Sequence, residues 1–207
     1  MKFKTIFFDF DGVLCHDYFY SNLKEPYPEV SSFIEKSIFG KGSEIPDKWM
    51  RAKLTMDDVN KIISQNTSID FNLLSNLFIE SVKMMRVDKN LLNLANHLKA
   101  KNIKVALVTN NMDVFNTVTI KHNNLDQIFP VIVNSFDYGL MKHDENGKLF
   151  DIALEKVGES DYSKVLLIDD STKMRAAFEN KGGATFPYDT FEGFEPWMKE
   201  HLLATTE

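Results

Sequence analysis

The sequence predicts an α/β protein with a doubly wound, mostly parallel, Rossmann-like sheet and a small inserted helical unit. From about residue 86 onward, apolar runs of strand length alternate with stretches of helical periodicity. Parallel strands need a right-handed crossover connection between them, and this alternation supplies the connections. The first apolar run lies near the start of the chain, and about seventy residues without a strand pattern separate it from the second.

The strands are predicted from apolar runs bounded by turn residues. Ile6, Phe7 and Phe8 form the first run, which is typical of a central strand buried on both faces. Four more runs of this kind follow, at residues 103–108, 131–133, 165–168 and 184–186. The same reasoning places helices at residues 91–98, 114–121, 150–157, 172–179 and 195–203.

The insert is predicted from helix-start signals. Ser32-x-x-Glu35 and Thr55-x-x-Asp58 have the spacing of a capping box, in which two side chains satisfy free backbone N–H groups at a helix start. Asp70 can cap a third helix, because leucines, a phenylalanine and a valine recur at helical spacing after it. The sequence therefore predicts an all-helical segment of about three helices.

These patterns predict two units of structure. Residues 1–15 and 86–207 are expected to form the Rossmann-like catalytic core, and residues 16–85 the inserted helical domain. The glycine- and proline-containing segment 40–47 is predicted as a loop within that insert. A chain of 207 residues is long enough for one sizeable core and a small second module.

Composition and charge favour a small-molecule substrate. The formal net charge is −6, and the basic residues are scattered, which argues against nucleic acid or an anionic membrane surface as a partner. The apolar start is interrupted by two aspartates before it reaches the length of a signal peptide, and no run approaches the roughly 18 residues of a membrane span. The single Cys15 cannot form an internal disulfide, which favours the reducing cytoplasm. We expect a monomer or a weak homodimer.

Acidic and polar side chains follow three of the predicted strands. In open α/β sheets, ligands bind beyond the carboxyl ends of the strands, where strand order reverses. A single Asp-x-Asp-Gly segment is equally well explained as a turn, but three apolar runs with polar ends indicate a shared pocket. The residues at these ends are Asp9 and Asp11, then Thr109 and Asn110, and then Asp169 and Asp170.

A pocket with several carboxylates needs protons or a cation. Two unit charges ~4 Å apart repel by about 4 kcal/mol at an effective dielectric constant near 20. Because the expected ligand atoms are all oxygens, the chemistry favours Mg²⁺ over zinc or copper. Thr109 and Asn110 can then donate hydrogen bonds to phosphate oxygens, and Lys142, in the loop after the third strand, can add a positive charge. An isolated loop lysine is usually a solvated surface charge. Lys142 is a candidate site residue only because of its position in the loop after the third strand.

Several other reactive side chains are interpreted as structural. Cys15 follows two apolar residues and is interpreted as a packed thiol rather than a nucleophile. The five histidines show no metal-ligand spacing. Trp49, Arg51 and Lys53 in the insert could contact a substrate, but a solvated, locally packed cluster is the preferred interpretation.

Four ordered motifs carry a resemblance to a known family. They are Asp9-Phe-Asp11-Gly-Val-Leu, then Val-Thr109-Asn, then Lys142, and then Ile-Asp169-Asp170-Ser. In this order they resemble the haloacid dehalogenase-like hydrolase superfamily, in its phosphatase and β-phosphoglucomutase-like branch. The position of the insert is similar to that of the family's C1-type helical cap. The chain departs from the family pattern at His143, where a proline is common, and in its short insert.

The resemblance implies a Mg²⁺-dependent phosphohydrolase that cleaves a small phosphorylated metabolite, a phosphomonoester, through an aspartyl-phosphate. By position, Asp9 is the implied nucleophile, and Asp11 the acid that protonates the leaving oxygen and later activates water. The implied metal site consists of Asp9, Asp11 through its carbonyl, Asp169 and Asp170. The implied phosphate-binding residues are Thr109, Asn110 and Lys142.

Three alternatives remain at this point. A phosphomutase would use the same residues and return the phosphoryl group to a second position on the substrate. A phosphoacceptor receiver domain also has an acidic Mg²⁺ pocket, but its phosphorylated aspartate lies in the middle of the chain and it has no helical insert. A catalytically idle binding protein on the same scaffold is the third, although none of the proposed catalytic positions is lost here.

Overall fold

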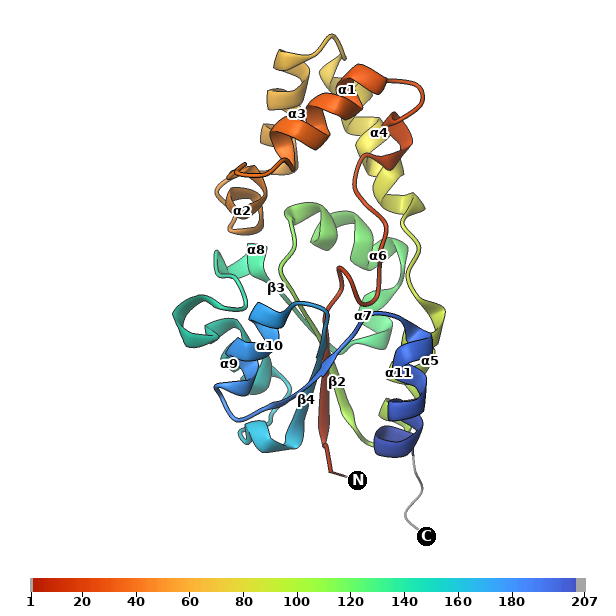
Figure 1. The fold of residues 1–207 in the computed structure, drawn as a ribbon, viewed down its shortest axis with the longest axis vertical. Coiled ribbons are helices and arrows are strands. Elements are labelled where there is room, and N and C mark those ends of the chain that lie inside the picture. Colours follow the sequence, from red (N-terminus) through yellow and green to blue (C-terminus); the bar gives the residue numbers. More distant parts are fainter. Residues whose placement is uncertain (1, 204–207) are drawn as a thin grey trace.

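A computed structural model describes residues 2–203 and shows a parallel sheet with helices on both faces (Figure 1). The strands of the described residues pair in the order β3-β2-β1-β4-β5, and every pair is parallel. This confirms the doubly wound α/β fold, and each predicted strand is present within one or two residues. The strands are β1 (Thr5–Phe8), β2 (Lys104–Thr109), β3 (Val131–Asn134), β4 (Val165–Asp169) and β5 (Ala184–Pro187).

β1 is the central strand, and its side chains alternate between two hydrophobic clusters. Ile6 and Phe8 pack on the side covered by α5 (Lys89–Ala100) and α11 (Phe191–Met198). Phe7 points to the opposite side, which is covered by α9 (Lys148–Lys156) and α10 (Thr172–Glu179). All four residues of β1 are buried, as the apolar run predicts for a strand covered on both faces.

The remaining core helices are short and follow β2 and β3. β2 leads into a π-helical turn (Phe115–Thr119) that continues as α6 (Ile120–His122), and then into α7 (Leu125–Ile128). α8 (Ser135–Tyr138) begins directly after β3. Because β1 pairs with both β2 and β4, the strand order reverses beside it, which is where ligands bind in folds of this class.

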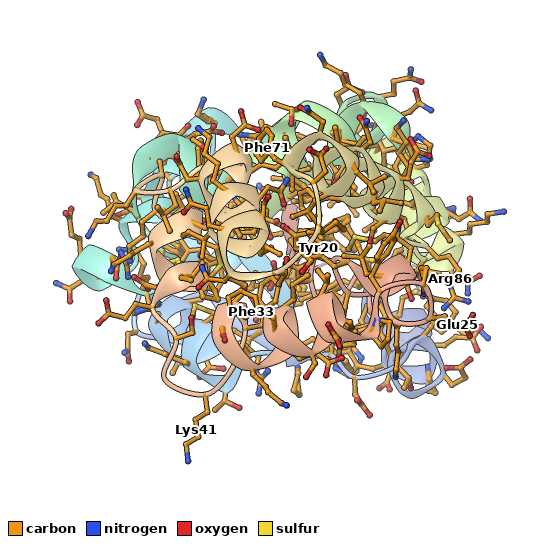
Figure 2. All side chains as sticks on the ribbon, turned by 90° about the horizontal axis from the view of Figure 1, so that it is seen from above. Tyr20, Glu25, Phe33, Lys41, Phe71 and Arg86 are labelled. Atoms are coloured by element: carbon orange, nitrogen blue, oxygen red, sulfur yellow. The ribbon has the colours of Figure 1, made fainter. Side chains whose placement is uncertain are left out.

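The insert forms a separate helical layer at the carboxyl end of the sheet. Figure 1 shows it above the strands, and the view from above in Figure 2 places Tyr20 of the insert near the middle of the molecule. Its helices enclose a hydrophobic cluster that includes Trp49, Ile63 and Phe78. The helices are η1 (Ser21–Leu23), α1 (Pro28–Phe33) with its π-helical continuation η2 (Ile34–Ile38), α2 (Ile45–Met50), α3 (Met56–Asn66) and α4 (Phe71–Met84).

The two chain segments that connect the insert to the core are joined to each other. The guanidinium of Arg86, at the edge of Figure 2, donates to Asp17 Oδ1 at 3.0 Å, and the backbone N–H of Arg86 donates to Asp17 Oδ2 at 2.8 Å. Just below, the backbone N–H of Asp88 donates to the carbonyl of Leu14 at 2.8 Å. The outgoing and returning segments therefore leave the core side by side.

Two predictions for the insert are wrong, and proline explains both. Ser32 does not cap a helix, because α1 begins at Pro28 and Ser32 lies inside it. Segment 40–47 is not entirely loop, since α2 begins at Ile45 with Pro46 in its first turn. Proline in the first turn of a helix loses no hydrogen bond, and its φ angle is already helical. One helix therefore begins at Pro28, before the predicted start at Ser32, and the other begins beside Pro46, inside the predicted loop. Within residues 16–85 the structure therefore has four α-helices rather than three.

Other helix-start predictions are confirmed. Thr55 and Asp58 form the capping box at the start of α3, and the Asp70 carboxylate accepts two backbone N–H groups at the start of α4. The last helix starts earlier than predicted, because the Thr190 hydroxyl caps it by accepting from the backbone N–H of Gly193. Among the helices of residues 2–203, none combines the length and apolar character needed to cross a bilayer.

Replacing Phe178 with alanine should destabilise the core strongly. The Phe178 ring is fully buried, with its centroid 5.9 Å from that of Phe7, 4.9 Å from that of Phe150 and 5.4 Å from that of Tyr162. We expect the free energy of unfolding to fall by about 3–5 kcal/mol in chemical denaturation. Met84→Ala, at a residue that is 65% exposed, is the control and should cost less than about 0.5 kcal/mol. Equal losses in the two variants would contradict this view of the core.

Candidate active site

The site centres on a buried lysine between two carboxylates. Nζ of Lys142 lies 2.6 Å from Asp9 Oδ2 and 2.6 Å from Asp169 Oδ2. Lys142 is 1% exposed, Asp9 6% and Asp169 0%. A buried ammonium is tolerated only when it is paired and hydrogen-bonded, and this one has two anionic partners. The ends of β1 and β4 and the loop after α8 therefore meet at one point.

The remaining carboxylate oxygens of Asp9 and Asp169 accept backbone N–H groups. Asp9 Oδ1 accepts from the N–H of Phe10 at 2.7 Å. Asp169 Oδ1 accepts from the N–H of Ser171 at 2.9 Å, so both of its oxygens are engaged. Each carboxylate is thus held in one orientation by its own strand end.

Asp11 and Asp170 lie on either side of a tight turn at Gly12. Gly12 has a φ angle of +76°, and a Cβ atom added there would lie 2.5 Å from the Asp170 carboxyl group. Glycine is therefore required both by the backbone conformation and by the close approach of Asp170. Asn111, which the sequence did not single out, donates from Nδ2 to Asp11 Oδ2 at 3.1 Å.

Burial and mutual repulsion shift the pKa values of these groups. Burial raises the pKa of Asp11 to about 7, with the Lys142 charge opposing the shift and Asp170 adding to it. The pKa of Asp9 is also raised, mainly by burial, although Lys142 opposes this strongly. Burial lowers the pKa of Lys142, but the charges of Asp9 and Asp169 outweigh that effect and the pKa is raised, so the ammonium stays protonated. Burial also raises the pKa of Asp170, with Asp169 adding to the shift.

The carboxylates fit a divalent cation. One oxygen each from Asp9, Asp169 and Asp170 lie within 4.8 Å of one another. With Asp11, four carboxyl groups gather around the ammonium of Lys142, and the raised pKa values of Asp9, Asp11 and Asp170 reflect how poorly this buried site tolerates so many negative charges. A bound cation would relieve this cost. Oxygen donors of this kind suit Mg²⁺, whereas zinc and copper sites use imidazole or thiolate.

The predicted phosphate-binding residues of β2 lie at the same edge. Thr109 is buried, and its Oγ1 has no hydrogen-bond partner among the described residues. Asn110 accepts with Oδ1 from the backbone N–H of Lys142 at 2.8 Å, which ties the lysine loop to the end of β2. The hydroxyl of Thr109 is thus left without a partner among the described residues, directly before Asn110 at the end of β2.

A cavity of about 830 Å³ opens above the carboxylates and beneath the insert. Asp9, Asp11, Asn110, Lys142 and Asp170 line its floor, whereas Thr109 and Asp169 do not reach the cavity surface. Residues of the insert form much of the remaining wall, among them Tyr18, Tyr20, Lys24, Ser31, Glu35 and Phe39, and the core adds Met112, Ser171 and Met174. The volume is in the range of small-molecule sites.

The structure shows the environment of three other residues that the sequence analysis interpreted as structural. Cys15 is a buried thiol, and burial raises its pKa to about 11, which agrees with a packed side chain and not with a nucleophile. Trp49 is buried, but its indole N–H donates to Asp113 of the core at 2.7 Å, so its polar partner lies outside the insert. Lys53 is exposed.

A parallel α/β sheet with two acidic strand ends, a buried lysine and an overlying helical insert defines a class of hydrolase, and comparison with known proteins agrees. The model of the haloacid dehalogenase-like hydrolase family matches residues 3–179. The chain therefore belongs to the haloacid dehalogenase-like hydrolase family, as the four motifs indicated.

Known proteins of the family resemble the chain in sequence or in structure. The pyrimidine 5'-nucleotidase YjjG of Escherichia coli is 33% identical over 72 residues, which is 35% of this chain and only 31% of that protein's length. A predicted HAD-like family hydrolase from Porphyromonas gingivalis matches with a TM-score of 0.76 and 15% identity, over 99% of this chain and 100% of that one. An enzyme of the HAD family from Bacteroides thetaiotaomicron, in complex with magnesium and inorganic phosphate, matches with a TM-score of 0.66 and 16% identity, over 89% and 93%. At these identities the structural matches establish the fold alone.

The turn at Gly12 can be tested with a matched pair of glycines. Gly12 and Gly42 both have positive φ angles, but a Cβ atom at Gly42 would meet nothing within 4 Å. Alanine at Gly42 should lower the free energy of unfolding by roughly 1–2 kcal/mol, the cost of the left-handed conformation. Alanine at Gly12 should cost distinctly more in chemical denaturation, because Asp170 must also move. Equal losses would show that Asp170 does not approach the turn as described.

Proposed function

We propose that the protein is a Mg²⁺-dependent phosphatase that hydrolyses a small phosphomonoester through an aspartyl-phosphate. The observation that carries this proposal is the Asp9 carboxylate, paired with buried Lys142 on the floor of a cavity that Asp11 and Asp170 also line. A nucleophile, an acid with a pKa near neutrality and a fixed positive charge are the groups that phosphoryl transfer needs.

In the first step, an Asp9 oxygen attacks the phosphorus atom and the bond from phosphorus to the leaving oxygen breaks. Asp11 gives its proton to that oxygen, so the alcohol leaves neutral. In the second step, Asp11 accepts a proton from water, the water oxygen attacks the phosphorus of the aspartyl-phosphate, and inorganic phosphate leaves Asp9 free again. The pKa of about 7 at Asp11 suits a group that alternates between acid and base at neutral pH. Lys142 and Asn110, which line the cavity, hold the transferring phosphoryl oxygens. Thr109 is buried directly before Asn110, at the end of β2, and supports the position of that residue.

The metal would be held by Asp9, the Asp11 carbonyl and one acid of the pair after β4. We propose Asp170 as the direct ligand, because Asp170 lines the cavity whereas both oxygens of Asp169 are engaged by Lys142 and Ser171. Asp169 then serves to orient Lys142. When bound, the cation neutralises the clustered carboxylates and draws negative charge from the phosphoryl group.

We propose the same domain division that the sequence predicts, with residues 1–15 and 86–207 as the catalytic core and 16–85 as the cap. The hydrophobic cluster of the insert, to which the core adds Met112 and Val114 as buried members, and the place of the insert over the cavity support this division. A cap in this position excludes water from the carboxylates and supplies the side chains that contact the leaving group. The substrate is a phosphorylated metabolite small enough for a cavity of about 830 Å³.

Asp9→Asn should abolish phosphate release and leave the fold intact. The amide has the size of the carboxylate but is not a nucleophile, so we expect a loss of at least about 10³-fold in kcat. The measurement is release of inorganic phosphate across sugar phosphates, phosphoglycolate and nucleotides, with circular dichroism to verify folding. Asp126→Asn, at an exposed residue of α7, is the control and should keep full activity. An Asp9→Asn variant that turned over substrate at the parent rate would exclude this mechanism.

Removing divalent cations should stop phosphate release, and added Mg²⁺ should restore it. Asp170→Asn should raise the Mg²⁺ concentration needed for half-maximal activity by about tenfold or more, because a ligand is weakened. Asp169→Asn should lower kcat with a smaller effect on the Mg²⁺ requirement, since it loosens Lys142 instead. Titration of activity with Mg²⁺ separates the two, and the reverse ranking would assign the direct ligand to Asp169.

A further inference from the structure

The short helix α2 of the insert and Arg51, the residue that follows it, are bonded to three core segments that follow the carboxyl ends of β2 and β3. The indole N–H of Trp49 donates to Asp113, in the loop after β2, at 2.7 Å. The hydroxyl of Ser135, at the start of α8, donates to the carbonyl of Met50 at 2.9 Å. The guanidinium of Arg51 pairs with Asp144, two residues after Lys142. α2 therefore contacts the core at the edge of the site, and Figure 1 shows it directly above α8.

We propose that Arg51 is a positioning residue, which fixes the loop of Lys142 through Asp144. Arg51 donates from both terminal nitrogens to the two oxygens of Asp144, with Nη2 to Oδ1 at 3.1 Å. Its Nε donates to Asp47 one turn earlier on α2, at 2.9 Å, which orients the guanidinium before it reaches the core. A guanidinium that donates to both oxygens fixes the orientation of the carboxylate as well as its distance. The ammonium of a lysine in the same place would fix the distance alone. The Arg51 and Asp144 side chains are only 18% and 19% exposed, so solvent screens the pair less than an ordinary surface pair.

Asp144 transmits this position to Lys142 by short backbone contacts. Asp144 Oδ2 accepts from the backbone N–H of Met141 at 2.9 Å, and the N–H of Asp144 donates to the Met141 carbonyl at 3.0 Å. Lys142 lies inside the turn that these bonds close. Its own N–H donates to Asn110 at 2.8 Å, so the loop is held from the insert on one side and from β2 on the other.

Arg51 acts through the loop and not on the substrate, because it is not among the residues that line the cavity. Its backbone carbonyl lies 3.5 Å from the position of a Cβ atom at Gly139, which begins the loop with a φ angle of +65°. The backbone of α2 is thus packed against one end of the Lys142 loop and its Arg51 side chain is bonded to the other end. Without the ion pair, the backbone of the Lys142 loop loses its anchor to the insert and keeps only its bond to Asn110. Small misplacements of a catalytic group can cost about 10²-fold in rate.

The first test is kinetic and rests on the proposed function. Arg51→Met should lower kcat by about tenfold or more with KM within about twofold, because Lys142 is misplaced but substrate contacts remain. Lys48→Met is the matched control, since Lys48 forms an exposed ion pair with Glu44 on the same helix, and it should keep the parent kcat. Arg51→Lys should recover part of the loss. The double variant Arg51→Met, Asp144→Asn should be no worse than the more affected single variant, because the two residues act through one contact.

The second test does not depend on activity. Hydrogen exchange followed by mass spectrometry should show faster exchange of the backbone amides of residues 139–147 in Arg51→Met than in the parent and in Lys48→Met. Unchanged exchange there would overturn the proposal, as would a rise in KM at constant kcat or a rise in kcat. If the parent protein released no phosphate from any substrate, that result would count against the proposed function. The exchange measurement would still test whether Arg51 fixes the loop of Lys142.

Discussion

The buried ammonium of Lys142 is the interaction on which the site depends. It lies 2.6 Å from carboxylates on two adjacent strands, and these acids would otherwise repel each other in a region without solvent. The lysine carries one charge and the cluster has four acids, so full ionisation of the acids is costly and the pKa values of Asp9, Asp11 and Asp170 are raised. A cation would offset this cost by stabilising the ionised carboxylates, and the cation and the lysine together can attract a phosphate. Structure and proposed chemistry therefore follow from the same charge balance.

The parallel sheet brings these charges together. β1 pairs with β4 in register, with Phe8 opposite Ile168, so Asp9 and Asp169 follow at the same level of neighbouring strands. The strand order reverses at β1, and this leaves space above these two strand ends for a ligand. Gly12 allows the backbone to turn directly after Asp11 and to pass close to the Asp170 carboxyl group. Strand order, register and one glycine thus determine the position of the acids before any ligand arrives.

How much the sequence could predict depends on the range of the interactions. Strands and most helices were predictable because burial on both faces and capping residues such as Thr55 and Asp70 are local signals. The start of α1 was missed because Ser32-x-x-Glu35 has the spacing of a capping box, whereas the helix begins at Pro28. The start of α2 was missed because Pro46 was read as a loop residue, although proline also suits the first turn of a helix. The contact between Arg51 and Asp144 joins residues 93 positions apart and leaves no local pattern. The same applies to Asn111, whose bond to Asp11 spans 100 positions.

The insert has two different relations to the core, and this limits how it can move. Its α1 side contributes Ser31, Glu35 and Phe39 to the cavity wall. Its α2 side is bonded to the core through Trp49, Met50 and Arg51. A displacement of the whole insert as one body would break all of these bonds and release the loop of Lys142, so an opened molecule would also have a loosened catalytic site. Val30, Ile34 and Ile38 on the α1 side pack in the same hydrophobic cluster as Trp49. Opening of the insert and loosening of the Lys142 loop are therefore expected to be coupled.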